Sequence, residues 1–156
     1  MIENKKALIY SLETSINQLE NIINQSILEN QPKEKEIYVI LGTALLWIGC
    51  CLDRLDEVEI SYSEEEKDYK QAFKGAYNVQ KHSIKLIRFD GFTSGSIFPM
   101  RWDFRWGDGN YYFKELEEDV IKNKSQILKY NKLLKDKEIL EEIKRIEKII
   151  KSKFGE

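Results

Sequence analysis

The sequence is poor in residues that interrupt helices and in residues that bind metals. Of 156 residues only two are proline, two are cysteine and one is histidine. Cys50 and Cys51 are adjacent, so they cannot bridge each other without severe strain. Together with one distant histidine they lack the spacing of a zinc site. We therefore expect buried free thiols in a reducing compartment, and neither a bound metal nor a cofactor.

A strong net charge is also absent. The 25 Lys and Arg residues nearly balance the 27 Asp and Glu residues, which leaves a net charge of -2. This balance gives no overall attraction to nucleic acid or to an anionic membrane, so either kind of binding would require a local patch. The sequence has no P-loop, Rossmann glycine pattern or nucleophile elbow, which argues against a small-molecule enzyme with a standard cofactor.

Neither a secretory segment nor a membrane-spanning one is expected. Residues 1–6 lack the hydrophobic core of a signal peptide. The most apolar stretch covers residues 37–55, but Asp53 and Arg54 make its end too polar to span a bilayer. The sequence thus predicts a cytoplasmic protein without a membrane partner.

Helical periodicity is what the sequence has in abundance. Apolar residues recur every three or four residues, which is typical of amphipathic helices. The expected helical segments are residues 4–29, 33–58, 64–88 and about 115–153. Asp136 is a candidate cap inside the last segment, which is therefore either one helix or two.

Local signals mark the expected helix starts and contacts. Ser63 and Glu66 form a capping-box pattern at the start of the third helix. Pro32 is expected in the first turn of the second helix, where its missing N–H costs nothing. Gly42 and Gly49 weaken that helix locally but allow a neighbour to come close.

The pattern changes after the third helix. Turn signals at residues 90–91 and 94–95 precede a period-two alternation over residues 98–106, which is typical of a strand. The alternating residues are Trp102, Phe104 and Trp106 on one side and Arg101, Asp103 and Arg105 on the other. We favour the interpretation that the aromatic side covers the open end of a bundle. The alternative is that it stacks on bases of single-stranded nucleic acid while the arginines bind phosphates.

These patterns together predict a mainly α fold in a single domain, residues 1–156. The expected architecture is an up-and-down bundle of four or five helices. A short β-hairpin-like insert, about residues 90–113, follows the third helix, and residues 111–113 are expected to return alongside the preceding strand.

His82 is the residue that invites chemistry. It follows Asn78 by one helical turn, so the two side chains can touch. An imidazole can act as a general base or a general acid, and Lys74 and Lys81 nearby would favour phosphate. The alternative is that a lone histidine on a mixed helix face is simply a surface or interface residue.

A second, mildly apolar stripe runs through His82. Gly75, Val79, His82 and Leu86 recur at helical spacing, and Gly75 would let another backbone approach. The stripe could pack against another helix of the bundle or against the same helix of a second copy. The latter predicts a homodimer with Gly75, Val79 and Leu86 in its interface.

The string Tyr77-Asn78-Val79-Gln80-Lys81-His82 resembles the signature of the HEPN superfamily (higher eukaryote and prokaryote nucleotide-binding domains). Those helical bundles carry an R-x(4–6)-H motif that often reads Arg-Asn-x-x-x-His. Asn78 and His82 match it, but Tyr77 stands where the arginine belongs and brings no positive charge. The segment from Gly75 to Pro99 is also similar to a small bacterial helical family, a likeness that implies no particular activity.

The HEPN resemblance implies a homodimer without a metal, and in many members RNA cleavage in toxin–antitoxin or phage-defence systems. On this resemblance His82 would be the acid or base and Asn78 would position the substrate. The residues expected to contact substrate are Lys74, Tyr77, Lys81, Arg101 and Arg105. The first hypothesis is therefore a HEPN-like protein that binds or cleaves RNA, with an antitoxin-like partner. The alternatives are a binder of RNA or nucleotides without cleavage, and a non-catalytic homodimeric interaction protein.

Overall fold

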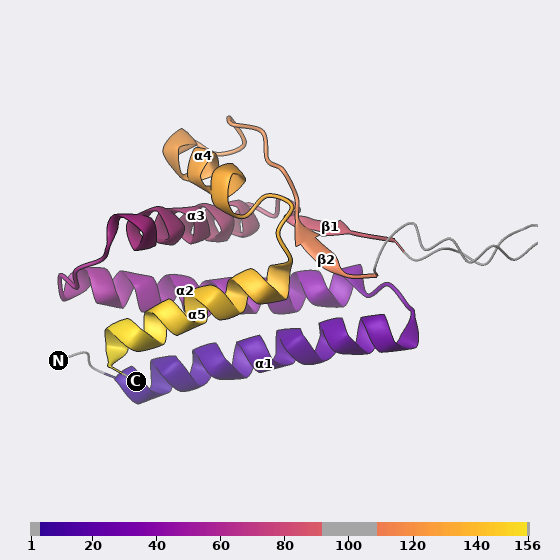
Figure 1. The fold of residues 1–156 in the computed structure, drawn as a ribbon, viewed down its shortest axis with the longest axis horizontal. Helices are drawn as coiled ribbons and strands as arrows, with labels where there is room; N and C mark the ends of the chain where they lie inside the picture. Colours follow the sequence, from indigo (N-terminus) through magenta and orange to yellow (C-terminus); the bar gives the residue numbers. More distant parts are fainter. Residues whose placement is uncertain (1–3, 92–108, 156) are drawn as a thin grey trace, which may run out of the picture.

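The computed structural model describes residues 4–91 and 109–155, which form a helical bundle with a small hairpin at one end (Figure 1). The elements in these residues are α1 (Lys5–Glu29), α2 (Glu34–Glu57), α3 (Glu64–Lys81), β1 (Ile87–Phe89), β2 (Tyr111–Phe113), α4 (Lys124–Leu133) and α5 (Ile139–Phe154). This confirms the mainly α fold with a short hairpin after the third helix. The alternating segment at 98–106 lies outside the described residues, so its expected strand and its two arginines receive no structural account.

α2 is the central helix of the bundle. It lies between α1 and α3, and α5 crosses it on one side while also contacting α1 (Figure 1). The buried positions of α2 include Ile37, Leu41, Leu45, Ile48 and Leu52. α2 has the length and mean hydropathy, 1.6, of a membrane-spanning helix, but 44% of that apolar window is buried within the bundle. Part of its apolar character is thus explained by the core that it fills.

Most helix boundaries agree with the sequence signals. At the start of α3 the Glu66 N–H donates to Ser63 Oγ (3.2 Å), and the Ser63 N–H donates to Glu66 Oε2 (2.8 Å). This is the predicted capping box. The N-cap of α2 is Lys33, so Pro32 lies one residue before the cap and not in the first turn.

The two glycines of α2 face α3, as their predicted role requires. A Cβ atom on Gly42 would lie 2.8 Å from Nε2 of Gln80, and one on Gly49 would lie 3.3 Å from the ring of Tyr77. A side chain at Gly49 would press on the Tyr77 ring, whereas one at Gly42 would meet the flexible end of Gln80. The antiparallel pair α2–α3 therefore packs closely along this line.

α3 ends at Lys81, so the prediction of a helix to about residue 88 is wrong. The chain leaves the helix through a Schellman motif. The Ile84 N–H donates to the Val79 carbonyl (3.2 Å) and the Ser83 N–H donates to the Gln80 carbonyl (2.9 Å). Ser83 takes the left-handed conformation with φ 60°. The apolar residues after it continue the helical spacing, but they belong to the connector and to β1.

The hairpin closes one end of the bundle. The antiparallel pairs are Ile87 with Phe113, Arg88 with Tyr112 and Phe89 with Tyr111. The hydroxyl of Tyr111 lies 2.7 Å from Ser26 Oγ and accepts a hydrogen bond from the Lys33 N–H (2.8 Å). Residues 111–113 do return as a strand, and their partner in the described residues is β1.

The last predicted helical segment is two helices, α4 and α5. They are separated at residues 134–138, where Asp136 has φ 60°. The cap position of α5 is Glu138 and not Asp136. Residues 114–123 are not helical, and the Asn131 side chain holds this segment by donating to the Leu116 carbonyl (2.7 Å) and accepting from the Leu116 N–H (3.0 Å). This loop forms one wall of the candidate site.

Candidate functional site at the end of α3

The last turn of α3 and the loop before α4 enclose a cleft of about 770 Å³. Its lining residues are Asn78, His82, Asp119, Val120, Ile121, Lys122, Asn123 and Lys124. The two residues that match the HEPN motif therefore lie in one cleft. His82 is exposed at the C-cap of α3, and Asn78 is half-buried one turn earlier.

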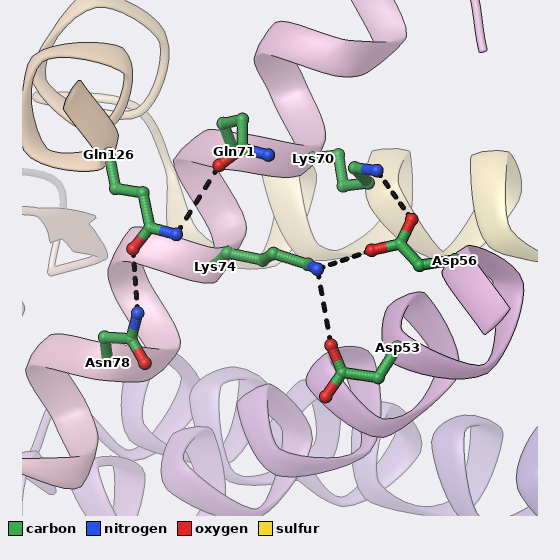
Figure 2. A network of polar contacts seen from close by, with 7 residues as sticks. All are labelled: Asp53, Asp56, Lys70, Gln71, Lys74, Asn78 and Gln126. Atoms are coloured by element: carbon green, nitrogen blue, oxygen red, sulfur yellow. Dashed lines mark hydrogen bonds and ion pairs between the residues drawn. The ribbon is translucent and has the colours of Figure 1, made fainter. Parts of the chain in front are cut away.

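The amide of Asn78 is held by α4. Its Nδ2 donates to Oε1 of Gln126 (2.7 Å), and Nε2 of Gln126 donates to Oε1 of Gln71 (3.4 Å) (Figure 2). Gln126 is buried, so this chain of three amides satisfies a polar group inside the α3–α4 contact. The Asn78 amide thus bonds to Gln126 and not to His82, and this bond fixes its orientation in the cleft.

The second stripe of α3 is covered by α4. A Cβ atom on Gly75 would lie 2.9 Å from the carbonyl oxygen of Gln126, and Val79 and Leu86 are fully buried. The occupant of this face is therefore another helix of the same chain. The prediction that Gly75, Val79 and Leu86 form a homodimer interface is wrong for this face, because α4 and the core already bury these residues. Leu86 also lies beyond the end of α3.

Lys74 points away from the cleft, toward α2. Its Nζ pairs with Oδ2 of Asp56 (2.6 Å) and Oδ1 of Asp53 (3.3 Å), and Lys70 pairs with the other oxygen of Asp56 (2.7 Å) (Figure 2). Burial by itself raises the pKa of the Asp56 carboxyl, but the two lysines hold that pKa below its usual range. Burial lowers the pKa of Lys74, and the two aspartates outweigh it and raise that pKa. Lys74 therefore stays protonated, but the carboxylates of Asp53 and Asp56 balance its charge. It is thus poorly placed to bind a phosphate.

The other predicted contact residues do not join the cleft either. The ring of Tyr77 lies against Gly49 of α2. Lys81 is exposed but does not line the cleft. Arg101 and Arg105 are outside the described residues. Of the predicted site residues that the structure describes, Asn78 and His82 are the two that line the cleft.

The cationic groups of the cleft were missed by the sequence reasoning. Lys122 and Lys124 are exposed at its wall, and neither forms an ion pair with another residue within 4–91 and 109–155. Asp119 is the acid on the same wall. The N-terminus of α4 opens here, with Asn123 accepting from the Gln126 N–H (3.2 Å), and it adds partial positive charge. The spacing of Asn123 and Gln126 is the capping signal that could have located this helix start.

The fold and the cleft define a small helical-bundle protein with a partly cationic, partly apolar cleft at one helix end. No family model, curated protein or solved structure matches this chain. Among the residues described, no group of three or more His, Cys, Asp or Glu side chains could hold a metal ion. A functional assignment therefore depends on the residues of the cleft.

Proposed function

We propose that this is a HEPN-like protein that binds RNA through the cleft at the end of α3. The observation that carries the proposal is that Asn78 and His82 line the same cleft as Lys122 and Lys124. The lysines would attract phosphates. The amide and the imidazole would contact 2′-hydroxyl groups or base edges, which is how proteins distinguish RNA from DNA.

The same geometry supports binding better than cleavage. The arginine of the HEPN motif is replaced by Tyr77, whose ring lies against α2 and outside the cleft lining. Lys122 and Lys124 supply charge, but an ammonium group does not offer the planar two-point contact that an arginine gives a phosphate. Attraction of the RNA backbone is retained, while stabilisation of the charge that develops during cleavage is weakened.

RNA cleavage is the second candidate, and the exposed imidazole of His82 favours it. Metal-independent cleavage removes a proton from the 2′-hydroxyl as it attacks phosphorus, and it delivers a proton to the departing 5′-oxygen. The chain has one histidine, and one imidazole serves one of these transfers at a time. The other transfer would need water, the Asp119 carboxyl on the same wall of the cleft, or a group from a second molecule. A positioned acid or base contributes roughly 10²–10⁴ in rate.

RNA binding is tested by fluorescence anisotropy with labelled single-stranded RNA at two salt concentrations. We expect binding that weakens as salt rises, and that weakens further in Lys122→Glu and Lys124→Glu. Lys148→Glu is the matched control, because Lys148 is an exposed lysine on α5 that does not line the cleft. A flat titration of the wild type at low salt, or equal losses in all three variants, contradicts the proposal.

Cleavage is tested separately by incubating varied RNAs with highly purified protein in EDTA. If His82 is an acid or base, His82→Ala lowers the cleavage rate by roughly 10²–10⁴, which is far more than it lowers the RNA affinity. Intact RNA after prolonged incubation with the wild type eliminates cleavage and leaves the binding proposal standing.

A further inference from the structure

One side of α2 carries a solvent-exposed apolar stripe. Val39 is 66% exposed and Leu46 is 42% exposed, while Thr43 is exposed and Cys50 is half-buried. These four residues recur at intervals of four, three and four, so they lie along one line of the helix. We call them the α2 ridge. Their exposure shows that no element that the structure describes covers this line.

Charged residues flank the α2 ridge in a regular pattern. Lys35 and Glu36 precede it, and Asp53 and Arg54 follow it. Lys35 and Asp53 are 18 residues apart, as are Glu36 and Arg54, and about 18 residues make five full helical turns. Each pair therefore projects along one edge of the ridge. Asp53 pairs with Lys74, which identifies its edge as the α3 side.

The pattern is symmetric about the peptide bond between Ala44 and Leu45. Val39 and Cys50 are equally far from it, as are Thr43 and Leu46. The flanking pairs are centred on Ala44 and on Leu45 themselves. When a two-fold axis runs across the helix, the same patch meets itself with its ends exchanged.

We propose that the α2 ridge is a homodimer interface in which α2 packs antiparallel on α2 of a second copy of this chain. Val39 then faces the partner's Cys50. Along the edges Glu36 faces the partner's Arg54 and Lys35 faces the partner's Asp53. All four charge contacts are between opposite charges. A parallel pair would exchange the two edges and place Lys35 beside the partner's Glu36 and Asp53 beside the partner's Arg54. The charges are therefore complementary to a second copy in both orientations. The charge-reversal and crosslinking experiments distinguish the two orientations.

The flanking charges are compatible with their contacts inside the chain. Arg54 also pairs with Glu57 of its own helix (2.7 Å), and its side chain remains 55% exposed. A guanidinium group presents several donors and can bridge two carboxylates. The α2 ridge shares no residue with the cleft at the end of α3, so this inference and the proposed function are independent.

Sedimentation over a concentration series tests the interface. We expect a wild-type dimer, and Leu46→Glu should shift it to monomer at every concentration tested. Leu128→Glu is the matched control, because Leu128 is a 51% exposed leucine on α4. Circular dichroism establishes that each variant is folded. A monomeric wild type at its highest soluble concentration, or a dimer that survives Leu46→Glu, overturns the proposal.

Charge reversal tests the antiparallel pairing. Glu36→Arg and Arg54→Glu should each weaken the dimer, because each places like charges together across the interface. The double variant restores both contacts and should recover most of the lost affinity. If the double variant is as weak as the sum of the two single ones, the pairing of Glu36 with the partner's Arg54 is wrong.

A thiol crosslink fixes the register. Val39→Cys places a thiol opposite the partner's Cys50, and mild oxidation should give a covalent dimer whose peptide map joins positions 39 and 50. Adding Cys50→Ser should abolish the link. Cys51 is fully buried, and burial raises the pKa of its thiol to about 12, so it does not compete. Links between positions 39 and 39, or 50 and 50, contradict the antiparallel arrangement.

Discussion

The backbone carbonyl oxygen of Gln126 lies 2.9 Å from the point where a Cβ atom on Gly75 would stand. Real Cβ atoms do not come this close to a backbone oxygen, so α3 and α4 cross at this point only because residue 75 has no side chain. The wall of the cleft that α4 provides depends on this crossing.

Gly75→Ala should therefore destabilise the protein by about 1–3 kcal/mol, the usual cost of forcing extra volume into a packed contact. This loss opposes the higher helix propensity of alanine. The measurement is urea denaturation. Gly42→Ala is the matched control, because its Cβ atom would meet the end of the flexible Gln80 side chain, which can move. Equal losses in the two variants would show that the crossing is not the cause.

Ser83→Gly should stabilise the protein. Ser83 holds the left-handed conformation that ends α3, and this conformation costs an L-residue about 1 kcal/mol that glycine does not incur. We expect a gain of roughly 0.5–1 kcal/mol and a higher melting temperature. Ser83→Ala retains the strain and should show no gain. A destabilised Ser83→Gly would mean that the serine side chain makes a contribution that outweighs the strain.

Tyr69→Phe should lower stability by about 1–3 kcal/mol, the cost of leaving a buried polar group without its donor. The Tyr69 hydroxyl donates to the carboxylate of Glu142, and both residues are buried. In a Glu142→Leu background, Tyr69→Phe should lower the free energy of unfolding much less, because no buried carboxylate then lacks a donor. Chemical denaturation of the four proteins measures this coupling. Independent, additive effects would contradict it.

Asp56→Asn should flatten the acid side of the stability profile. The pKa of the Asp56 carboxyl lies below its ordinary value of 3.8, despite burial, because of Lys70 and Lys74. A carboxyl with a depressed folded-state pKa stabilises the fold above the unfolded-state pKa, and this contribution is lost as pH falls toward the folded-state pKa. Unfolding free energies of the wild type should therefore fall more steeply below about pH 4 than those of the variant.

Asp53→Asn is the control for the pH experiment. Asp53 makes one longer contact, at 3.3 Å, and its side chain is 67% exposed. Solvent screens such a pair, so its removal should change stability by well under 1 kcal/mol at any pH. If Asp53→Asn and Asp56→Asn alter the profile equally, the two lysines do not act mainly through Asp56.

The helices were predictable because their signals are local. The capping box at Ser63 and the apolar spacing of α1 and α2 both depend on neighbours within one or two turns. The end of α3 could not be predicted in this way, because Ile84 and Ile87 continue the helical spacing beyond it. Ser83 takes the left-handed conformation, a position at which a helix end usually has glycine. Burial against the core, which is a tertiary effect, decides where those two residues lie.

The candidate site likewise has residues that local sequence predicts and residues that only tertiary packing brings together. Asn78 and His82 are one turn apart, so their common cleft follows from the helix alone. Lys122, in the loop before α4, and Lys124, the first residue of α4, enter it about 40 residues later. No pattern in the sequence predicts that approach. Lys74 lies outside the site because it pairs with Asp53 and Asp56 of α2. That contact depends on how α2 packs against α3, which the sequence pattern does not reveal.

The anchoring of α4 has a consequence for the motions of the protein. In the described part of the chain, α3 is the one helix against which α4 packs extensively, whereas α2 packs against three helices. Segments held by few neighbours open locally at a smaller free-energy cost than the centre of a core. The two walls of the cleft should thus belong to units of different local stability. Amide protons of α4 should exchange with solvent sooner than those of α2, and an occupant that bridges His82 and Lys124 should slow the exchange in α4 most.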